Sequence, residues 1–169
     1  ESDYILYTYA GPEISVATTK AYSTQLIAMY LLAVESAMVK GVIGEDRYKE
    51  LLEEMGTLPE KIQKTLEDKE RIQWFASKYA NARDIFFIGR GIDYAISLEG
   101  SLKMKEISYI HSEAYAAGEL KHGTISLIED GTLVVGVATQ KGLFEKTVSN
   151  MVEVKSRGAY LMGLTLYRK

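Results

Sequence analysis

The chain has 169 residues, of which 47% are hydrophobic and 25% are charged, and its formal net charge at pH 7 is -3. This length suffices for one globular domain with its own core, and a small negative charge without a basic cluster argues against nucleic-acid binding. The chain contains no cysteine, which excludes disulfides, thiol nucleophiles and cysteine metal sites.

The longest unbroken apolar run, Leu26 to Val34, is about half of the roughly 20 residues that a membrane-spanning helix needs. It therefore predicts a buried core helix. The chain opens with Glu1, Ser2 and Asp3, without the basic and apolar regions of a secretory signal. We expect no membrane span and a cytoplasmic location.

The first half of the chain is predicted to be mostly helical. Tyr4 to Tyr9 alternates aromatic and aliphatic residues, which indicates a strand before a loop at Gly11-Pro12. Thr18 or Thr19 then offers an N-cap for a helix that runs to about Lys40 and is apolar on nearly every face, as expected of a helix packed on both sides. An amphipathic helix around residues 48–55 follows, and a further helical stretch runs from Pro59 to Tyr79 with a break near Asp68.

From Asp84 the pattern changes to alternating strands and helices. The predicted elements are a strand at Ile85 to Ile88, a Gly89-Arg90-Gly91 turn, a helix to about Ser108, a polar stretch, a strand at Leu133 to Ala138, a helix at Leu143 to Ser156 and a strand at Tyr160 to Leu164. Short apolar strands joined by crossover helices predict an α/β fold, a flavodoxin-like parallel sheet with helices on both faces.

Both ends of this pattern look cut. The first predicted strand stands alone before some seventy residues of helix, and the chain ends on a strand with no covering helix. One hypothesis is that Tyr4 to Tyr9 joins the sheet beside Tyr160 to Leu164.

Two groups of residues in this second half of the chain could carry chemistry. The glycines of Gly89-Arg90-Gly91 would let backbone amides approach a phosphate at a helix start, although packing alone also explains such a turn. Glu99, Lys103 and Glu106 fall at i, i+4 and i+7 of one helix and share a face. A carboxylate beside a lysine suits enediol chemistry, but the spacing is also that of an ordinary solvated ion pair.

The two histidines and a cluster of hydroxyls are weaker candidates. His122 lies in a predicted loop, where an imidazole can serve as an acid catalyst, whereas His111 is placed near a helix end. Thr18, Thr19, Ser23 and Thr24 could bind a sugar oxygen or simply cap a helix. These patterns favour a small-molecule enzyme over a binding module without fixing its substrate.

Two segments resemble one known family. Residues 98–123, LEGSLKMKEISYIHSEAYAAGELKHG, closely resemble the signature of the second sugar-isomerase (SIS) lobe of the glucosamine-6-phosphate synthases. Residues 10–25, AGPEISVATTKAYSTQ, resemble the end of the first lobe and the helix that links the lobes. The resemblance implies the last strand and loop of the first lobe at 1–20, linking helices at 21–80 and the first part of the second lobe at 81–169.

The resemblance also implies roles for individual residues. Glu106 corresponds to the base that moves a proton between C1 and C2, and Lys103 to the residue that assists at the C2 oxygen. His122 corresponds to the histidine that opens the fructose ring and reaches into the neighbouring subunit of a homodimer. Val16 and Thr18 match positions that line the sugar site. No metal or redox cofactor is implied.

The implied substrate is fructose 6-phosphate, the product is glucosamine 6-phosphate, and the implied partner domain is a glutaminase that supplies ammonia. The family's phosphate-binding loops and imine-forming lysine have no counterpart in residues 1–169, so the isolated chain is expected to be inactive. Thr124 stands where the family usually has proline. A phosphosugar-sensing SIS module and a deglycase of another aminated sugar phosphate remain as alternatives.

Overall fold

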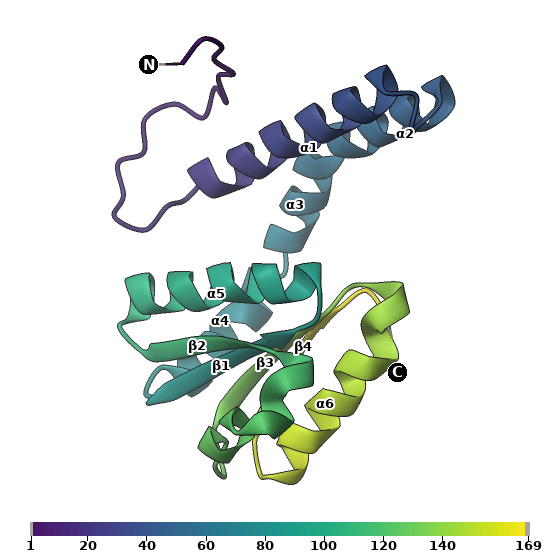
Figure 1. The fold of residues 1–169 in the computed structure, drawn as a ribbon. Coiled ribbons are helices and arrows are strands. Elements are labelled where there is room, and N and C mark those ends of the chain that lie inside the picture. The colour runs from purple at the N-terminus through teal and green to yellow at the C-terminus, as the bar shows by residue number, and fades with distance from the viewer. Residues whose placement is uncertain (1, 168–169) are drawn as a thin grey trace. The chain divides into compact units, whose positions relative to one another are not determined.

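The computed structural model describes residues 2–167, and the chain divides into two compact units, Glu1–Phe75 and Ala76–Lys169. The first unit contains α1 (Ala21–Val39), α2 (Glu45–Gly56) and α3 (Leu58–Leu66), and α4 (Lys69–Tyr79) crosses the boundary between the units. The predicted helices of the first half, including the break near Asp68, are therefore confirmed (Figure 1).

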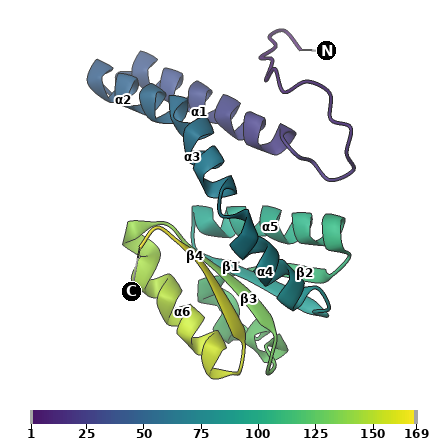
Figure 2. The same ribbon diagram turned by 180° about the vertical axis from the view of Figure 1, so that it is seen from behind.

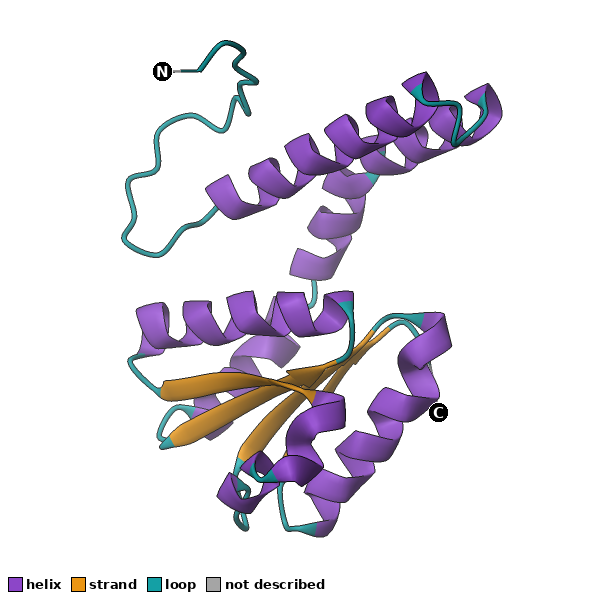
Figure 3. Cartoon of the chain, viewed as in Figure 1, coloured by secondary structure: helices purple, strands orange, loops and turns teal. Residues whose placement is uncertain are grey.

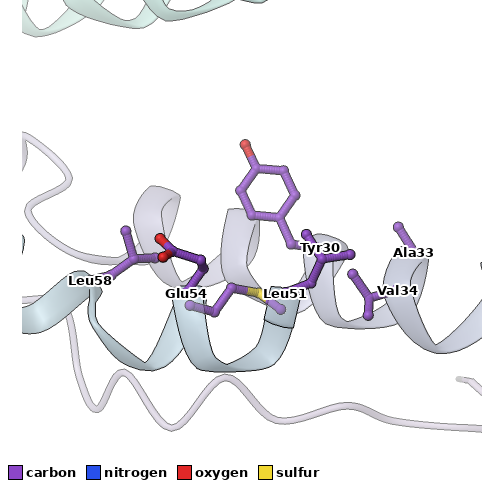
Figure 4. Close-up of a pocket in the computed structure, with 7 residues that line it drawn as sticks. Tyr30, Ala33, Val34, Leu51, Glu54 and Leu58 are labelled. Atoms are coloured by element: carbon purple, nitrogen blue, oxygen red, sulfur yellow. The ribbon is translucent and has the colours of Figure 1, made fainter. Parts of the chain in front are cut away.

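Helix α1 packs against α2 along one side, where the Tyr48 hydroxyl donates a 2.8 Å hydrogen bond to Glu35. An apolar pocket of about 310 Å³ lies between the two helices and the start of α3 (Figure 4). Ala28 is the one buried residue of α1 in the described chain. The prediction that this helix is covered on both sides is therefore wrong for residues 2–167, because α2 covers only one of its apolar faces.

By length and composition alone, α1 is the one helix among the described residues that could cross a membrane. Core helices of globular proteins have the same length and composition, so this feature does not by itself indicate a membrane.

The second unit is built on a four-stranded parallel sheet in the order β2-β1-β3-β4. Its strands are β1 (Asp84–Gly89), β2 (His111–Ala116), β3 (Leu133–Ala138) and β4 (Tyr160–Thr165). In register, Phe86 lies opposite Glu113 on one side and Val134 on the other. The predicted α/β class and parallel sheet are confirmed (Figure 3).

Helices cover both faces of this sheet. Helix α5 (Ile92–Ser108) lies on one face and α6 (Phe144–Ser156) on the other, as Figures 1 and 2 show from opposite sides. The core follows the alternation of the strands, with Phe86, Ile88 and Val134 facing α6 and Ile85, Phe87 and Leu133 facing α5. Three short 3-10 helices complete the unit: η1 (Ala117–His122), η2 (Thr124–Leu127) and η3 (Lys141–Leu143).

Three local predictions are wrong. Tyr4 to Tyr9 forms no strand and does not join β4, because an isolated extended segment needs a neighbouring strand to pair its backbone and none of the described strands does so. His111 begins β2 instead of ending a helix, and β2 was missed because its sequence is polar and rich in alanine. Helix α1 has Lys20 at its N-cap, without a side-chain hydrogen bond from Thr18 or Thr19.

One buried carboxylate joins the two central strands at their carboxyl ends. Asp93, in the first turn of α5, is 2% exposed. Its Oδ2 accepts a 2.9 Å hydrogen bond from the backbone N–H of Thr139, and its Oδ1 accepts a 2.6 Å hydrogen bond from the Thr139 hydroxyl. The Gln140 side chain donates to the Arg90 carbonyl at 2.6 Å. The β1–α5 turn is therefore tied to the loop after β3.

We expect Asp93→Asn to destabilise the second unit by about 2 kcal/mol, because the amide places a donor against the donors of Thr139 and leaves buried groups unpaired. The free energy of unfolding from urea denaturation of this chain measures the change. Asp130→Asn, an exposed aspartate in the same unit, is the control. Equal stability of the Asp93 and Asp130 variants would show that the buried link contributes little.

Candidate active site

Lys103 lies between two carboxylates on one face of α5. Its Nζ donates a short hydrogen bond to Glu106 Oε2 and lies 3.6 Å from Glu99 Oε1. The side chains of Lys103, Glu99 and Glu106 are 22%, 22% and 26% exposed. The ion pair predicted from the spacing forms, and it is partly withdrawn from water instead of fully solvated.

The hydrogen bond to Glu106 raises the pKa of the Lys103 ammonium, with further support from the charges of Glu106 and Glu99. Lys103 is therefore a fixed cation at neutral pH. A carboxylate beside a fixed ammonium can take and return a proton while the cation stabilises oxyanion charge on a neighbouring atom. This arrangement suits proton transfer between adjacent carbons of a sugar.

His122 does not lie near this pair within the chain. Glu106 is in the last turn of α5, just before β2 begins, whereas His122 ends η1, just after β2 ends. Lys121, the residue before His122, pairs with Glu153 of α6 at 2.7 Å, on the face of the sheet opposite to α5. The acid-base pair and the exposed histidine therefore belong to segments on opposite faces of the sheet.

Val16 and Thr18 belong to the first unit, in the loop before α1. Val16 is 97% exposed, and Thr18 is partly buried. The loop is held by Glu13, whose Oε1 accepts a 2.7 Å hydrogen bond from the Thr19 hydroxyl and whose Oε2 accepts from the backbone N–H groups of Thr19 and Lys20 at 3.2 and 3.3 Å. Glu13 thus accepts hydrogen bonds at the start of α1, which the threonines were predicted to cap. No sequence pattern had indicated Glu13 for this role.

A second carboxylate pairing on β2 was also missed. Tyr115 donates a short hydrogen bond to Glu113, and its ring contacts Phe86. Burial, followed by the hydrogen bond to Glu113, raises the pKa of Tyr115 to about 12. Tyr115 is therefore a neutral donor at physiological pH and lies two residues before η1.

The crevice at the carboxyl ends of β1 and β3, where open α/β sheets usually bind ligands, is crossed by the Asp93 side chain. The Gly89-Arg90-Gly91 turn is likewise occupied by the protein's own Gln140 and Asn150 side chains. This geometry favours the packing interpretation of the turn over the phosphate interpretation. Among residues 2–167, no group of three His, Cys, Asp or Glu side chains is arranged to hold a metal ion.

A parallel sheet covered by helices on both faces, with a carboxylate and lysine pair on its first crossover helix, defines an α/β domain of the doubly wound class. Residues 78–167 match the SIS domain. The chain belongs to the SIS domain family.

Curated relatives point to one kind of protein within this family. The chain is 59% identical over 162 residues to the glutamine–fructose-6-phosphate aminotransferase (isomerizing) of Caldanaerobacter subterraneus, a match that covers 96% of this chain and 27% of that protein. The chain therefore spans about a quarter of that relative's length.

Solved structures agree with this match. The C-terminal domain of glucosamine-fructose-6-phosphate aminotransferase from Francisella tularensis superposes with a TM-score of 0.90 at 37% identity, over 93% of this chain and 44% of that chain. Glucosamine-6-phosphate deaminase from Thermotoga maritima superposes with a TM-score of 0.67 at 28% identity, over 90% and 44% of the respective chains.

Glu13 provides a pH test of the loop that carries Val16 and Thr18. The hydrogen bond from Thr19 lowers the pKa of Glu13 below its ordinary value of 4.5. Since the folded-state pKa is the lower one, the stabilisation is present above pH 4.5 and is lost as the pH falls through the lowered pKa. We expect the Thr19 and Lys20 amides to exchange faster in that acid range relative to an unstructured peptide at the same pH.

NMR amide exchange measures this loss, and Glu13→Gln should show the fast exchange already at neutral pH. Glu45→Gln, in the first turn of α2, is a matched control at another helix start. Equal protection of the Thr19 and Lys20 amides in the wild type and in Glu13→Gln would contradict the assignment of Glu13 as the cap.

Proposed function

We propose that this chain is the isomerase part of a glutamine–fructose-6-phosphate aminotransferase, which converts fructose 6-phosphate and glutamine-derived ammonia into glucosamine 6-phosphate for amino-sugar biosynthesis. The observation that carries this proposal is the partly buried Lys103, held between Glu99 and Glu106 on α5. The 59% identity to a relative of that name supports it. Residues 1–169 contain the proton-transfer residues and, on this proposal, are inactive alone.

Glu106 is the proposed base. In the protonated imine of fructose 6-phosphate, its carboxylate takes a proton from C1; the C1–H electron pair forms the C1–C2 double bond while the C2–N double-bond pair moves to nitrogen, which gives an enolamine. The same carboxyl returns a proton to C2 while the C1 hydroxyl releases its proton to water, which leaves C1 as the aldehyde and the amine on C2. Lys103 remains protonated because of its raised pKa and stabilises the oxygen charge that develops during these steps.

His122 is the proposed acid for opening the sugar ring, and it serves the site of a second copy. The position of its segment beside α6 supports this arrangement, because Glu106 lies on α5 at the opposite face of the sheet. In a homodimer each site would take Glu106 from one subunit and His122 from the other. Val16 and Thr18 are the proposed sugar-lining residues of the first unit.

The domain assignment and location follow from the same proposal. Residues 1–20 would end a first SIS lobe, 21–80 would link the lobes and 81–169 would begin the second lobe. A glutaminase domain elsewhere in the longer protein would deliver ammonia, and the enzyme would act in the cytoplasm.

Glu106→Gln tests the proposed base in the full-length protein that contains this chain. We expect the rate of fructose 6-phosphate conversion to fall between about 10²- and 10⁴-fold, because an amide cannot accept the C1 proton. Glucosamine 6-phosphate formation in a coupled assay measures the rate. Glu60→Gln, which removes an exposed carboxylate on α3, is the control and should leave the rate unchanged. Undiminished turnover in Glu106→Gln would refute the assignment.

Mixed dimers test whether the site is shared. Glu106→Gln and His122→Ala full-length proteins should each be inactive, but random reassociation makes half of the dimers hybrid, with one intact site each. Activity should recover to about one quarter of the wild-type value. Tagged and untagged wild-type subunits, mixed in the same way, confirm that subunits exchange. Exchange without recovered activity would place both residues in one subunit's site.

Deamination of an amino sugar phosphate is a second candidate, favoured by the superposition on the Thermotoga maritima deaminase. It would use the same proton transfer in the opposite direction and release ammonia. Ammonia consumption by the full-length protein supports synthesis, whereas net ammonia release from glucosamine 6-phosphate supports deamination.

A further inference from the structure

Arg90 is a partly buried cation that the proposed reaction does not use. It follows β1, and its Nε and Nη2 donate hydrogen bonds of 3.1 and 2.9 Å to the same oxygen of Asn150 on α6. Asn150 is 4% exposed, so this acceptor is fixed within the core of the unit. A guanidinium held in this way is a rigid planar surface.

That surface lies against η1, the segment that ends at His122. A methyl group added at Gly118 would lie 3.1 Å from both terminal nitrogens of Arg90. The absence of a side chain at Gly118 therefore lets the guanidinium rest directly on the η1 backbone. Figure 3 shows this short helical segment beside α6.

A second polar link reaches the same segment. Lys121, the residue before His122, pairs with Glu153 of α6 at 2.7 Å, and Asn150 donates to the other oxygen of Glu153 at 3.4 Å. The hydrogen bond from Lys121 lowers the pKa of Glu153, so the pair is charged on both sides at neutral pH. Helix α6 thus holds η1 at two points: Asn150 holds it through Arg90, and Glu153 holds it through Lys121.

Apolar burial fixes the inner side of η1 as well. Ala117 and Leu120 are fully buried in the core on the α6 side of the sheet. Their burial sets the depth of the segment, while the contacts of Arg90 and Lys121 set its position along α6. His122 is left exposed at the end of a segment that is held by the core on its inner side and by α6 beside it.

We propose that Arg90 is a positioning residue for His122: with Asn150 it forms the surface on which η1 rests, so that an exposed imidazole is presented in a fixed place. The proposal rests on the catalytic role proposed above for His122. Arg90 contacts no substrate in this assignment and acts only through η1.

Arg90→Met tests the proposal because it keeps an unbranched apolar stem and removes the guanidinium with its donors. In the full-length protein we expect kcat to fall about tenfold or more with KM within twofold, since a small displacement of a catalytic group slows chemistry without weakening sugar binding. Asn150→Asp keeps the acceptor for Arg90 but loses the donor to Glu153, so it should keep more of kcat than Asn150→Leu, which should match Arg90→Met. Arg47→Met, an exposed arginine of α2, is the control.

Amide hydrogen exchange of residues 117–123 supplies a readout independent of turnover. Arg90→Met should speed exchange there and leave β3 and β4 protected. Glu153→Gln, at a side chain of α6 that is 29% exposed, should loosen the same amides through Lys121 and leave β3 and β4 protected.

Three results would overturn the proposal: unchanged exchange at 117–123 in Arg90→Met, unchanged kcat in that variant while His122→Ala is inactive, or equal losses in Asn150→Asp and Asn150→Leu. Full activity of His122→Ala would instead refute the catalytic role of His122. The exchange data would then still show whether Arg90 positions η1.

Discussion

The burial of β1 and β3 on both faces is the constraint on which the rest of the second unit depends. A parallel strand cannot return to its neighbour by a hairpin, so each connection must cross the sheet, and α5 and α6 do so on opposite faces. A crossover helix runs antiparallel to the strands. The last turn of α5, with Glu106, therefore lies at the amino ends of the strands on one face, whereas η1, with His122, lies beside α6 on the other face.

The sequence predicted the elements that burial alone determines. The apolar runs of β1 and β3 and the break between α3 and α4 could be read directly, because each rests on side-chain periodicity or backbone chemistry within a few residues. Lys103 and Glu106 were also found, since i, i+3 and i+4 spacing places residues on one helix face regardless of the tertiary fold. Their partial burial could not be read from spacing, because it depends on what packs around α5.

The features that were missed all depend on contacts between distant residues. β2 has a polar sequence and becomes a strand only because β1 offers it a paired edge. Glu13 reaches Thr19 and Lys20 across a loop, and Asp93 reaches a residue 46 positions away. Tyr4 to Tyr9 shows the converse case: its alternation is typical of a strand, yet the described chain gives it no partner. Side-chain alternation shows that a segment can form a strand, but whether it does depends on a neighbouring strand that pairs with its backbone.

The Gly89-Arg90-Gly91 turn shows how one local motif can serve two purposes. Glycines before a helix leave the backbone open, and in many α/β proteins a phosphate fills that space. Here the space is filled from within the chain: Asp93 crosses to the loop after β3, Gln140 covers the Arg90 carbonyl, and the arginine side chain turns toward α6. The turn thus ties the end of β1 to the loop after β3 and, through Asn150, to α6, the helix that also pairs with η1. This use of the motif favours a role in internal packing over a phosphate site.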